Sequence, residues 1–240
     1  MRWSSRSEAS RSETCRSSNR GSRVGQLTRR RQNHDRSSAV GWPGGDESDP
    51  GADRAAENAV AQARYVVDFI EEQLRSDQRF TLTPDLLCTL NRLAVDGIVA
   101  DAGEFRSANL TIAGSRHVPP DWSLVPSLVD DCCLYVNKCA TDQALHQAAY
   151  VMWRVNCIHP FADGNGRTAR AATYVVFSVS QRILLPGRTI LPERIARERI
   201  KYHKVLEEAD RAWKKLETVA LQNAEGFLDR LIRAQLSDVD

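Results

Sequence analysis

The residues from His159 to Arg170 are the part of the chain whose types and spacing could carry out chemistry. They read His-Pro-Phe-Ala-Asp-Gly-Asn-Gly-Arg-Thr-Ala-Arg. The Gly-Asn-Gly turn can aim several backbone N–H groups at one point, because glycine tolerates positive φ angles. The apolar helix expected from Thr168 to about Ile183 would add the partial positive charge of its N-terminus. This segment therefore predicts a cradle for a phosphate group.

Four side chains in the segment add charge and a proton acceptor to this cradle. Arg167 and Arg170 are three residues apart and would bind phosphate oxygens from one side of the helix. Asp163 would repel a bare phosphate, but it fits a Mg²⁺ ion held between carboxylate and phosphate. His159 titrates near neutral pH and could take a proton from an incoming hydroxyl. Each of these residues alone is more often structural, and an Asp-Gly-Asn-Gly turn is usually only a turn.

Together these residues match a long and specific pattern. The segment resembles the Fic family signature H-x-F-x-[DE]-G-N-G-R-x-x-R, and every fixed position is met. The resemblance extends from about Glu57 to Leu236. It implies that His159 is the general base and that Asp163 binds Mg²⁺. It also implies a nucleotide site formed by Asp163, Gly164, Asn165, Gly166, Arg167, Thr168, Ala169 and Arg170.

The activity implied by this resemblance is protein adenylylation. A Ser, Thr or Tyr hydroxyl of a target protein would receive AMP from ATP, and pyrophosphate would leave. Related proteins move UMP, phosphate or phosphocholine, or remove AMP again, and these activities remain alternatives. Phosphate-transferring, Doc-like members carry Lys at the second glycine of the motif, so Gly166 argues against that activity. A nucleotide-binding module without catalysis is the alternative from another class of function.

Three further regions are implicated by the resemblance alone. A flap would hold the target as an added strand and touch the nucleotide through Thr111, Ile112, Ala113 and Gly114. Tyr202, His203 and Asp210 would line the adenine side, although the family often has Tyr-Tyr and Asn there. Asp53-Arg-Ala-Ala-Glu57-Asn58 resembles an inhibitory motif whose glutamate pairs with the second motif arginine, so Glu57 is a candidate regulatory residue.

The apolar periodicity predicts an all-α domain, a Fic-type helical bundle with a small β-hairpin flap. Helix-spaced apolar residues recur in six segments, at 57–74, 83–97, 125–139, 143–154, 168–183 and 219–236, and a seventh helix is expected from Pro192 to Trp213. Val60, Ala63, Val67, Ile70 and Leu74 form the expected buried stripe of the first helix. Residues 103–120 alternate at short range, which indicates the hairpin.

The composition divides the chain into an arm, residues 1–52, and the Fic domain, residues 53–240. Residues 1–36 hold ten Arg and three acidic residues, a net charge of +7, which leaves −5 for the remainder. The arm is rich in Ser, Arg and Gly and is expected to be disordered. The whole protein is therefore not expected to bind nucleic acid, although the run Arg29–Arg31 could contact it.

The lack of a membrane segment indicates a cytoplasmic protein, and the resemblance implies ATP and a protein substrate bound along the flap as its partners. No apolar run is long enough to span a bilayer, and Met1 is not followed by the apolar core of a signal peptide. The six cysteines lack the paired spacing of a zinc site, so they are expected to be reduced and structural. The target, the nucleotide selectivity and the oligomeric state, a homo-oligomer included, are left open by the sequence.

Overall fold

The computed structural model describes residues 50–139, 143–216 and 218–238 of the chain. The described helices are α1 (Pro50–Arg75), α2 (Pro84–Val95), α3 (Val125–Lys138), α4 (Ala144–Ile158), α5 (Asn165–Ser180), α6 (Leu191–Arg197), α7 (Arg199–Leu216) and α8 (Gln222–Ser237), with a 3-10 turn η1 (Trp122–Leu124) before α3. Of the predicted arm, residues 50–52 belong to α1, and residues 1–49 lie outside the described part. The predicted all-α class is confirmed.

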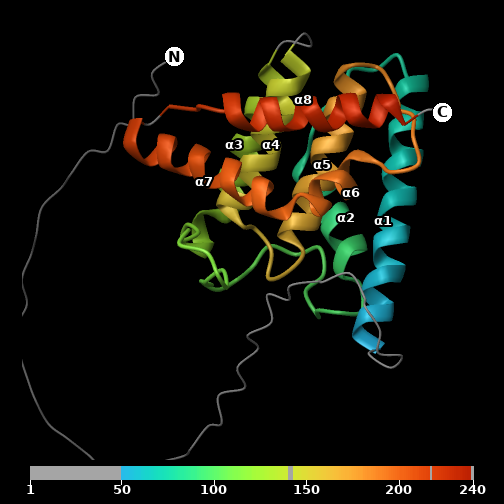
Figure 1. Ribbon diagram of the computed structural model, residues 1–240. Coiled ribbons are helices and arrows are strands. Elements are labelled where there is room, and N and C mark those ends of the chain that lie inside the picture. The colour runs from blue at the N-terminus through green and yellow to red at the C-terminus, as the bar shows by residue number, and fades with distance from the viewer. Residues whose placement is uncertain (1–49, 140–142, 217, 239–240) are drawn as a thin grey trace, which may run out of the picture. The chain divides into compact units, whose positions relative to one another are not determined.

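Helices α4 and α5 form the centre of the fold. They pack on each other more extensively than any other pair, and only the motif loop, residues 159–164, separates them along the chain. Their side chains include the largest fully buried residues of the domain, Trp153 and Tyr174. Helices α1 and α2 lie against α5, α3 lies against α4, and α8 crosses the end of α4 at the top of Figure 1. The motif loop is therefore held between two buried helices.

Local signals in the sequence explain where the helices begin and end. Thr83 caps α2, because its hydroxyl accepts a hydrogen bond from the N–H of Leu86 at 3.2 Å, and Pro84 takes the first helical position. Helix α4 continues beyond residue 154, where the helix was expected to end, to Ile158, and His159 is its C-cap. The helix expected from Pro192 to Trp213 is broken at Glu198 and forms α6 and α7.

The buried face of α1 differs from the predicted stripe. Val60 is 61% exposed, whereas Asn58, Gln62 and Val66 are buried together with Ile70. The amide of Gln62 donates to the Leu90 carbonyl at 2.7 Å, and the two polar residues of this face therefore pack against α2. The predicted stripe therefore holds at Ile70, which is buried, and at Ala63, Val67 and Leu74, which are partly buried, but it is wrong at Val60.

The predicted β-hairpin does not form. No strand occurs in the described ranges, and residues 103–121 follow an irregular path with a turn in which the Ser115 N–H donates to the Ile112 carbonyl at 3.1 Å. The backbone of this segment is held instead by side chains, above all by Arg106, whose guanidinium binds the carbonyls of Ala108 and Pro120. We call residues 103–121 the flap loop.

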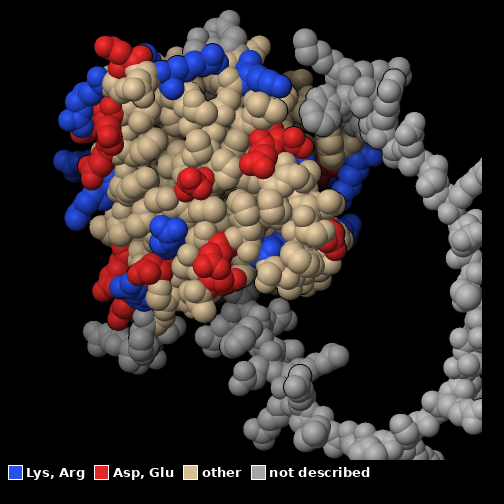
Figure 2. Space-filling view, turned by 180° about the vertical axis from the view of Figure 1, so that it is seen from behind, with Lys and Arg blue, Asp and Glu red and all other residues tan. Residues whose placement is uncertain are grey.

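The surface and the cysteines add two observations. Figure 2 shows basic and acidic residues interspersed on the face of the molecule that it draws, without a continuous basic area.

The five cysteines within the described residues are free thiols, as expected, and Cys15 lies outside the described residues. None of the described helices is long and apolar enough to cross a membrane.

Candidate active site

His159 occupies the C-cap of α4 with a left-handed backbone. Its φ of 52° and ψ of 60° turn the chain out of the helix, while its N–H still donates to the Val155 carbonyl at 2.9 Å. The imidazole Nδ1 lies 3.4 Å from the Asn156 carbonyl, which can only accept. The Nδ1–H tautomer is therefore favoured, and Nε2 keeps a lone pair that can accept a proton.

The surroundings of His159 favour the neutral imidazole. Burial lowers the pKa of His159 to about 4, and the neighbouring His117 and Arg106 act in the same direction. The Asn156 carbonyl and Asp163 oppose this shift. The ring is therefore uncharged at neutral pH, as a proton acceptor must be.

Arg106 joins the flap loop to the motif loop. Its Nε donates to the His159 carbonyl at 2.8 Å, and its backbone N–H donates to the Pro160 carbonyl at 2.8 Å. The same guanidinium binds the flap-loop carbonyls of Ala108 at 3.0 Å and Pro120 at 2.6 Å. The side chain is buried, and burial lowers the pKa of its guanidinium. One buried cation therefore fixes both segments around the histidine.

Asn165 closes the motif loop on itself. Its side-chain oxygen accepts from the Phe161 N–H at 3.0 Å, and its amide donates to the Phe161 carbonyl at 2.8 Å. Phe161 is buried, with its ring centroid 5.6 Å from that of Phe105. The side chain of Asn165, which was expected to bind nucleotide, therefore holds the motif loop together. Its backbone N–H is among the first of α5, which have no partner inside the helix.

Gly164 is the N-cap of α5 and fits closely against α2. Its φ is 78°, and a Cβ at this position would lie 2.7 Å from Val95 Cγ1 and 2.8 Å from Asn91 Nδ2. Asn91 is buried and donates to the Asp163 carbonyl at 2.8 Å, while its oxygen accepts from the Gly103 N–H at 3.0 Å. The start of α5 is therefore positioned by α2.

The first N–H groups of α5 and the carboxylate of Asp163 lie at the same end of the helix. Asp163 is partly exposed and accepts from the Gly164 N–H at 2.6 Å and from Arg167 at 3.1 Å. Arg167 also donates to the Ala94 carbonyl at 2.7 Å. Helix geometry leaves the first N–H groups without partners inside the helix, so an anion is favoured here.

Arg170 is a partly buried cation without a carboxylate partner. No ion pair joins it to an acidic group anywhere in the described residues, and its guanidinium donates instead to the Tyr202 hydroxyl. That hydroxyl also accepts from the Asn156 amide at 2.7 Å. Burial lowers the pKa of Arg170, and the positive charges of Arg167 and Arg199 contribute in the same direction. An anionic ligand would relieve this uncompensated charge.

The other expected site residues fall into different surroundings. Thr168 and Ala169 are buried inside the fold, and the Thr168 hydroxyl donates to the Gly164 carbonyl at 3.0 Å. In the flap loop, Thr111, Ala113 and Gly114 are exposed and Ile112 is half-buried. His203 is exposed, with its ring centroid 5.6 Å from that of Tyr202. Asp210 points inward, where it accepts from Trp153 Nε1 at 2.7 Å and pairs with His117.

Glu57 lies apart from Arg170 in this structure. Its carboxylate is 68% exposed and pairs with Arg54 at 3.2 Å, and Arg54 also pairs with Asp96. The Asn58 amide donates to the Asp96 carbonyl at 2.8 Å. The motif that resembles an inhibitory helix is therefore attached to the end of α2, and its proposed contact with Arg170 is not made.

The sequence reading missed three residues that build the site: Asn91, Arg106 and Asn156. Asn91 carried a signal, because it follows Leu90 on the inward side of a strongly apolar helix, where a polar residue needs a partner. Arg106 and Asn156 lie in segments without such a pattern, and only the structure places them beside His159 and Tyr202.

Comparisons with known proteins agree with this architecture. Residues 81–177, which contain α2, the flap loop, α3, α4, the motif loop and most of α5, match the Fic/DOC family. No curated protein sequence matches the chain.

Solved structures share the fold at low identity. A Fic family protein from Desulfovibrio desulfuricans G20 has a TM-score of 0.58 and 19% identity, with 80% of this chain and 54% of that chain covered. A Fic domain containing signaling protein from Bacteroides thetaiotaomicron has a TM-score of 0.56 and 22% identity, with 76% and 69% covered. Fic-1 from C. elegans, residues 134–508, has a TM-score of 0.54 and 19% identity, with 79% and 54% covered.

The match has a clear extent. The chain spans about half the length of the Desulfovibrio and C. elegans structures. The matched residues 81–177 include the whole motif loop and the helices that hold it, and the fold is shared with all three structures. Residues 81–177, less than half of the chain, are therefore similar to the Fic/DOC family, and the chain shares the fold of these Fic structures.

Proposed function

We propose that this chain is a protein adenylyltransferase that moves AMP from ATP to a hydroxyl of a target protein. Members of the Fic/DOC family are generally transferases of AMP or of other groups. The observation that carries the proposal is the geometry of the motif loop, which places His159 at the C-cap of α4 shortly before the N-terminus of α5, whose first two turns carry Arg167 and Arg170. A proton acceptor beside a polyanion site is what transfer of a phosphorus-containing group to a hydroxyl requires.

The reaction is an in-line displacement at the α-phosphorus of ATP. The hydroxyl oxygen of the target forms the new bond to phosphorus, the bond to the bridging oxygen of the β-phosphate breaks, and pyrophosphate leaves. His159 Nε2 takes the hydroxyl proton. The N–H groups of the first turn of α5, with Arg167 and Arg170, bind the phosphate oxygens. The target lies along the flap loop, whose exposed residues Thr111 and Ala113 are accessible from solvent.

Asp163 fits the Mg²⁺ that this reaction implies. The carboxylate is partly exposed at the helix N-terminus, and Mg²⁺ is commonly bound by one or two carboxylates together with phosphate oxygens and waters. The ion would neutralise phosphate charge when it is bound. Arg167, which now pairs with Asp163, would then be free to bind phosphate.

The central test is transfer of label from ATP labelled at the α-phosphate. We expect His159→Ala to lower the rate by about 10²- to 10⁴-fold, the typical contribution of a general base, with nucleotide binding retained. His146→Gln is the matched control, because His146 pairs with Glu225 away from the motif loop. Transfer by His159→Ala at the rate of the unchanged protein would exclude this mechanism.

The same assay separates the related activities. Adenylylation transfers the α-label of ATP and not the γ-label, whereas phosphate transfer does the reverse. Labelled UTP and a phosphocholine donor test the remaining groups, and loss of label from a pre-modified target tests removal of AMP. If the γ-label and not the α-label of ATP were found on the protein, the activity would be phosphate transfer and not AMP transfer.

A further inference from the structure

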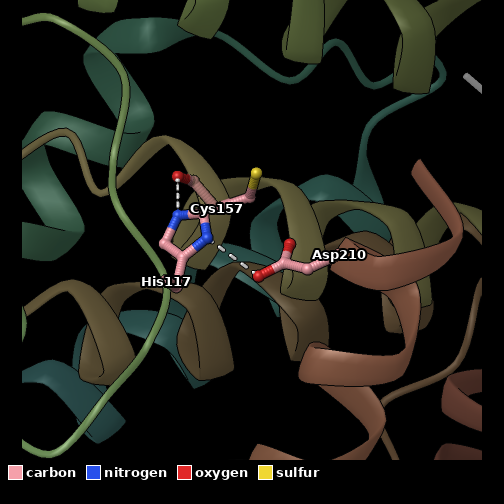
Figure 3. Close-up of side chains that lie close together, drawn as sticks. All are labelled: His117, Cys157 and Asp210. Carbon is pink, nitrogen blue, oxygen red and sulfur yellow. Dashed lines mark hydrogen bonds and ion pairs between the residues drawn. The ribbon is translucent and has the colours of Figure 1, made fainter. Parts of the chain in front are cut away.

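Three side chains from separate parts of the fold meet next to the active site, and nothing in the proposed reaction uses them together. His117 comes from the flap loop, Cys157 from the last turn of α4, and Asp210 from α7 (Figure 3). One ligand atom of each, a ring nitrogen, the Sγ and a carboxylate oxygen, lie within 4.8 Å of one another. Within the described residues this is the only such group of three His, Cys, Asp or Glu side chains.

The imidazole of His117 is held in one tautomer by its neighbour. Its Nε2 lies 2.7 Å from the Cys157 carbonyl, which can only accept, so Nε2 carries a proton. Nδ1 lies 2.9 Å from Asp210 Oδ2, yet it makes no well-directed hydrogen bond. The lone pair of His117 Nδ1 therefore faces a lone pair of Asp210 Oδ2, which is unfavourable unless a cation lies between the two atoms.

The arrangement around the three side chains is typical of a metal site. A histidine that binds a metal generally donates its other N–H to a carbonyl or carboxylate, as His117 does. The carboxylate ligand is itself usually held by a hydrogen bond, and Trp153 Nε1 donates to Asp210 Oδ1 at 2.7 Å. The side chains of His117 and Asp210 are only 10% and 15% exposed.

We propose that His117 Nδ1, Cys157 Sγ and Asp210 Oδ2 bind a divalent transition-metal ion, and that zinc fits best. Zinc is bound by thiolate, imidazole and carboxylate groups in tetrahedral sites, and three protein ligands leave the fourth position to water. The thiolate separates this site from the Mg²⁺ site at Asp163, because Mg²⁺ takes oxygen ligands.

The charges of the site balance when the metal is bound. Cys157 must lose its proton to solvent, and one thiolate and one carboxylate then neutralise a divalent ion beside a neutral imidazole. Burial raises the pKa of the Cys157 thiol to about 12, with a contribution from Asp210, so the thiol is protonated without the metal. Arg154 Nη1 lies 3.8 Å from Sγ and favours the thiolate. The pKa of His117 is raised, above all by Asp210, whereas burial and the charge of Lys214 act to lower it.

The position of the site gives the metal a structural effect. It would join the flap loop and α7 to the end of α4, two residues before His159. Asp210, expected to line the adenine side, would instead hold this junction. The inference does not depend on which group the enzyme transfers.

The alternative to a metal ion between His117 Nδ1 and Asp210 Oδ2 is a proton. A protonated His117 would donate from both nitrogens, to the Cys157 carbonyl and to Asp210, and this contact raises the pKa of His117. The two states differ in a measurable way, because only the metal state has a bond to sulfur.

The test is a titration of the full-length, chelator-treated protein with Co²⁺ and then with Zn²⁺. We expect a near-ultraviolet thiolate-to-cobalt absorption band that saturates at one ion per chain and is removed by zinc. Cys157→Ser should abolish the band and weaken zinc binding by at least about tenfold, the loss seen even for outer partners of metal ligands. Cys139→Ser and Cys15→Ser are the matched controls, and both should keep the band.

Two further measurements keep the test decisive if Cys157→Ser does not fold. Asp210→Asn should keep the band but weaken zinc binding, and zinc should raise the Tm of the unchanged protein and not that of His117→Asn. The proposal is overturned if the unchanged protein gives no thiolate band. It is equally overturned if nitrogen NMR at pH 7 with excess zinc shows both nitrogens of His117 protonated.

Discussion

At the scale of single residues, Gly164 and Gly114 share a left-handed backbone but differ in their surroundings. Their φ angles are 78° and 71°. A Cβ on Gly164 would overlap Val95 and Asn91, whereas a Cβ on Gly114 would have nothing within 4 Å. The same substitution at the two positions therefore separates backbone strain from close packing.

We expect Gly164→Ala to lower the free energy of unfolding by about 2–4 kcal/mol, the sum of left-handed strain and overpacking. Gly114→Ala should cost only about 1 kcal/mol, because strain alone applies there. Urea denaturation followed by circular dichroism measures both. Equal losses at the two positions would show that α2 does not press on the start of α5.

The low pKa of His159 predicts the acid side of the pH profile. The imidazole stays neutral until the pH falls to about 4, so the acid limb of label transfer should lie near that value. In the unfolded chain the group titrates near its ordinary value, about 6.5, so the unfolded state binds more protons between these values and the fold loses stability as pH falls. Initial rates are compared at each pH with circular dichroism. An acid limb near pH 6.5 in folded protein would contradict a buried, neutral base.

At the scale of elements, α1 and the flap loop are held by polar side chains that hydropathy does not reveal. Gln62 binds α2 from the buried face of α1, and Arg106 binds carbonyls on both sides of the site. The buried face of α1 was expected to be wholly apolar, but it contains the polar residue Gln62. The flap was expected to be held by hydrogen bonds between two strands, but it is held by the guanidinium of Arg106. The contact of Gln62 determines which face of α1 packs on α2, and the contacts of Arg106 determine how the flap loop lies against the motif loop.

The phase of α1 can be tested with two valines of one helix. Val66 is 1% exposed and Val60 is 61% exposed. We expect Val66→Ala to lower the free energy of unfolding by about 2 kcal/mol through lost burial and a cavity. Val60→Ala should stay within about 0.5 kcal/mol. A larger loss of unfolding free energy for Val60→Ala than for Val66→Ala would show that Val60 is buried, as the sequence predicted.

Arg106→Lys tests whether the fork of the guanidinium joins the two loops. An ammonium group cannot reach four carbonyls arranged around a plane, so we expect a loss of about 2–4 kcal/mol in stability and a larger fall in label transfer. Arg182→Lys is the control, since the guanidinium of Arg182 binds two backbone carbonyls but is exposed to solvent. If the two variants behave alike, the flap loop is held by other contacts.

These elements show what could be predicted from the sequence and why the rest could not. Helix α2 was predicted closely, because Thr83-Pro84 and the leucine spacing act within one helix. The motif residues from His159 to Arg170 were found because they lie together along the chain. Contacts between distant segments, such as Asn91 with Asp163 or Asn156 with Tyr202, carry no local pattern and needed the fold.

At the scale of the whole molecule, α1 presents Glu57 to solvent and to Arg54 rather than to Arg170. The lock implied by the inhibitory motif therefore needs α1 or Arg170 to move.

The lock hypothesis predicts that Glu57→Gly raises auto-modification with ATP and Mg²⁺ several-fold, because the carboxylate would no longer compete for Arg170. Ala59→Gly is the control, since Ala59 is an exposed neighbour in α1 and bears the same cost of a glycine, about 1 kcal/mol. Incorporation of the α-label into the protein itself is the measurement. An unchanged rate in Glu57→Gly would end the hypothesis.

Under the proposed function, the hydrogen bonds of Arg106 would couple two binding events thermodynamically. A ligand that moves residues 108–120 changes the hydrogen bonds that the same guanidinium makes to residues 158–160. By linkage, a target that alters nucleotide affinity by some factor must have its own affinity altered by the nucleotide by that same factor. Binding of the target protein and binding of the nucleotide would then favour or oppose each other through the contacts of this one side chain.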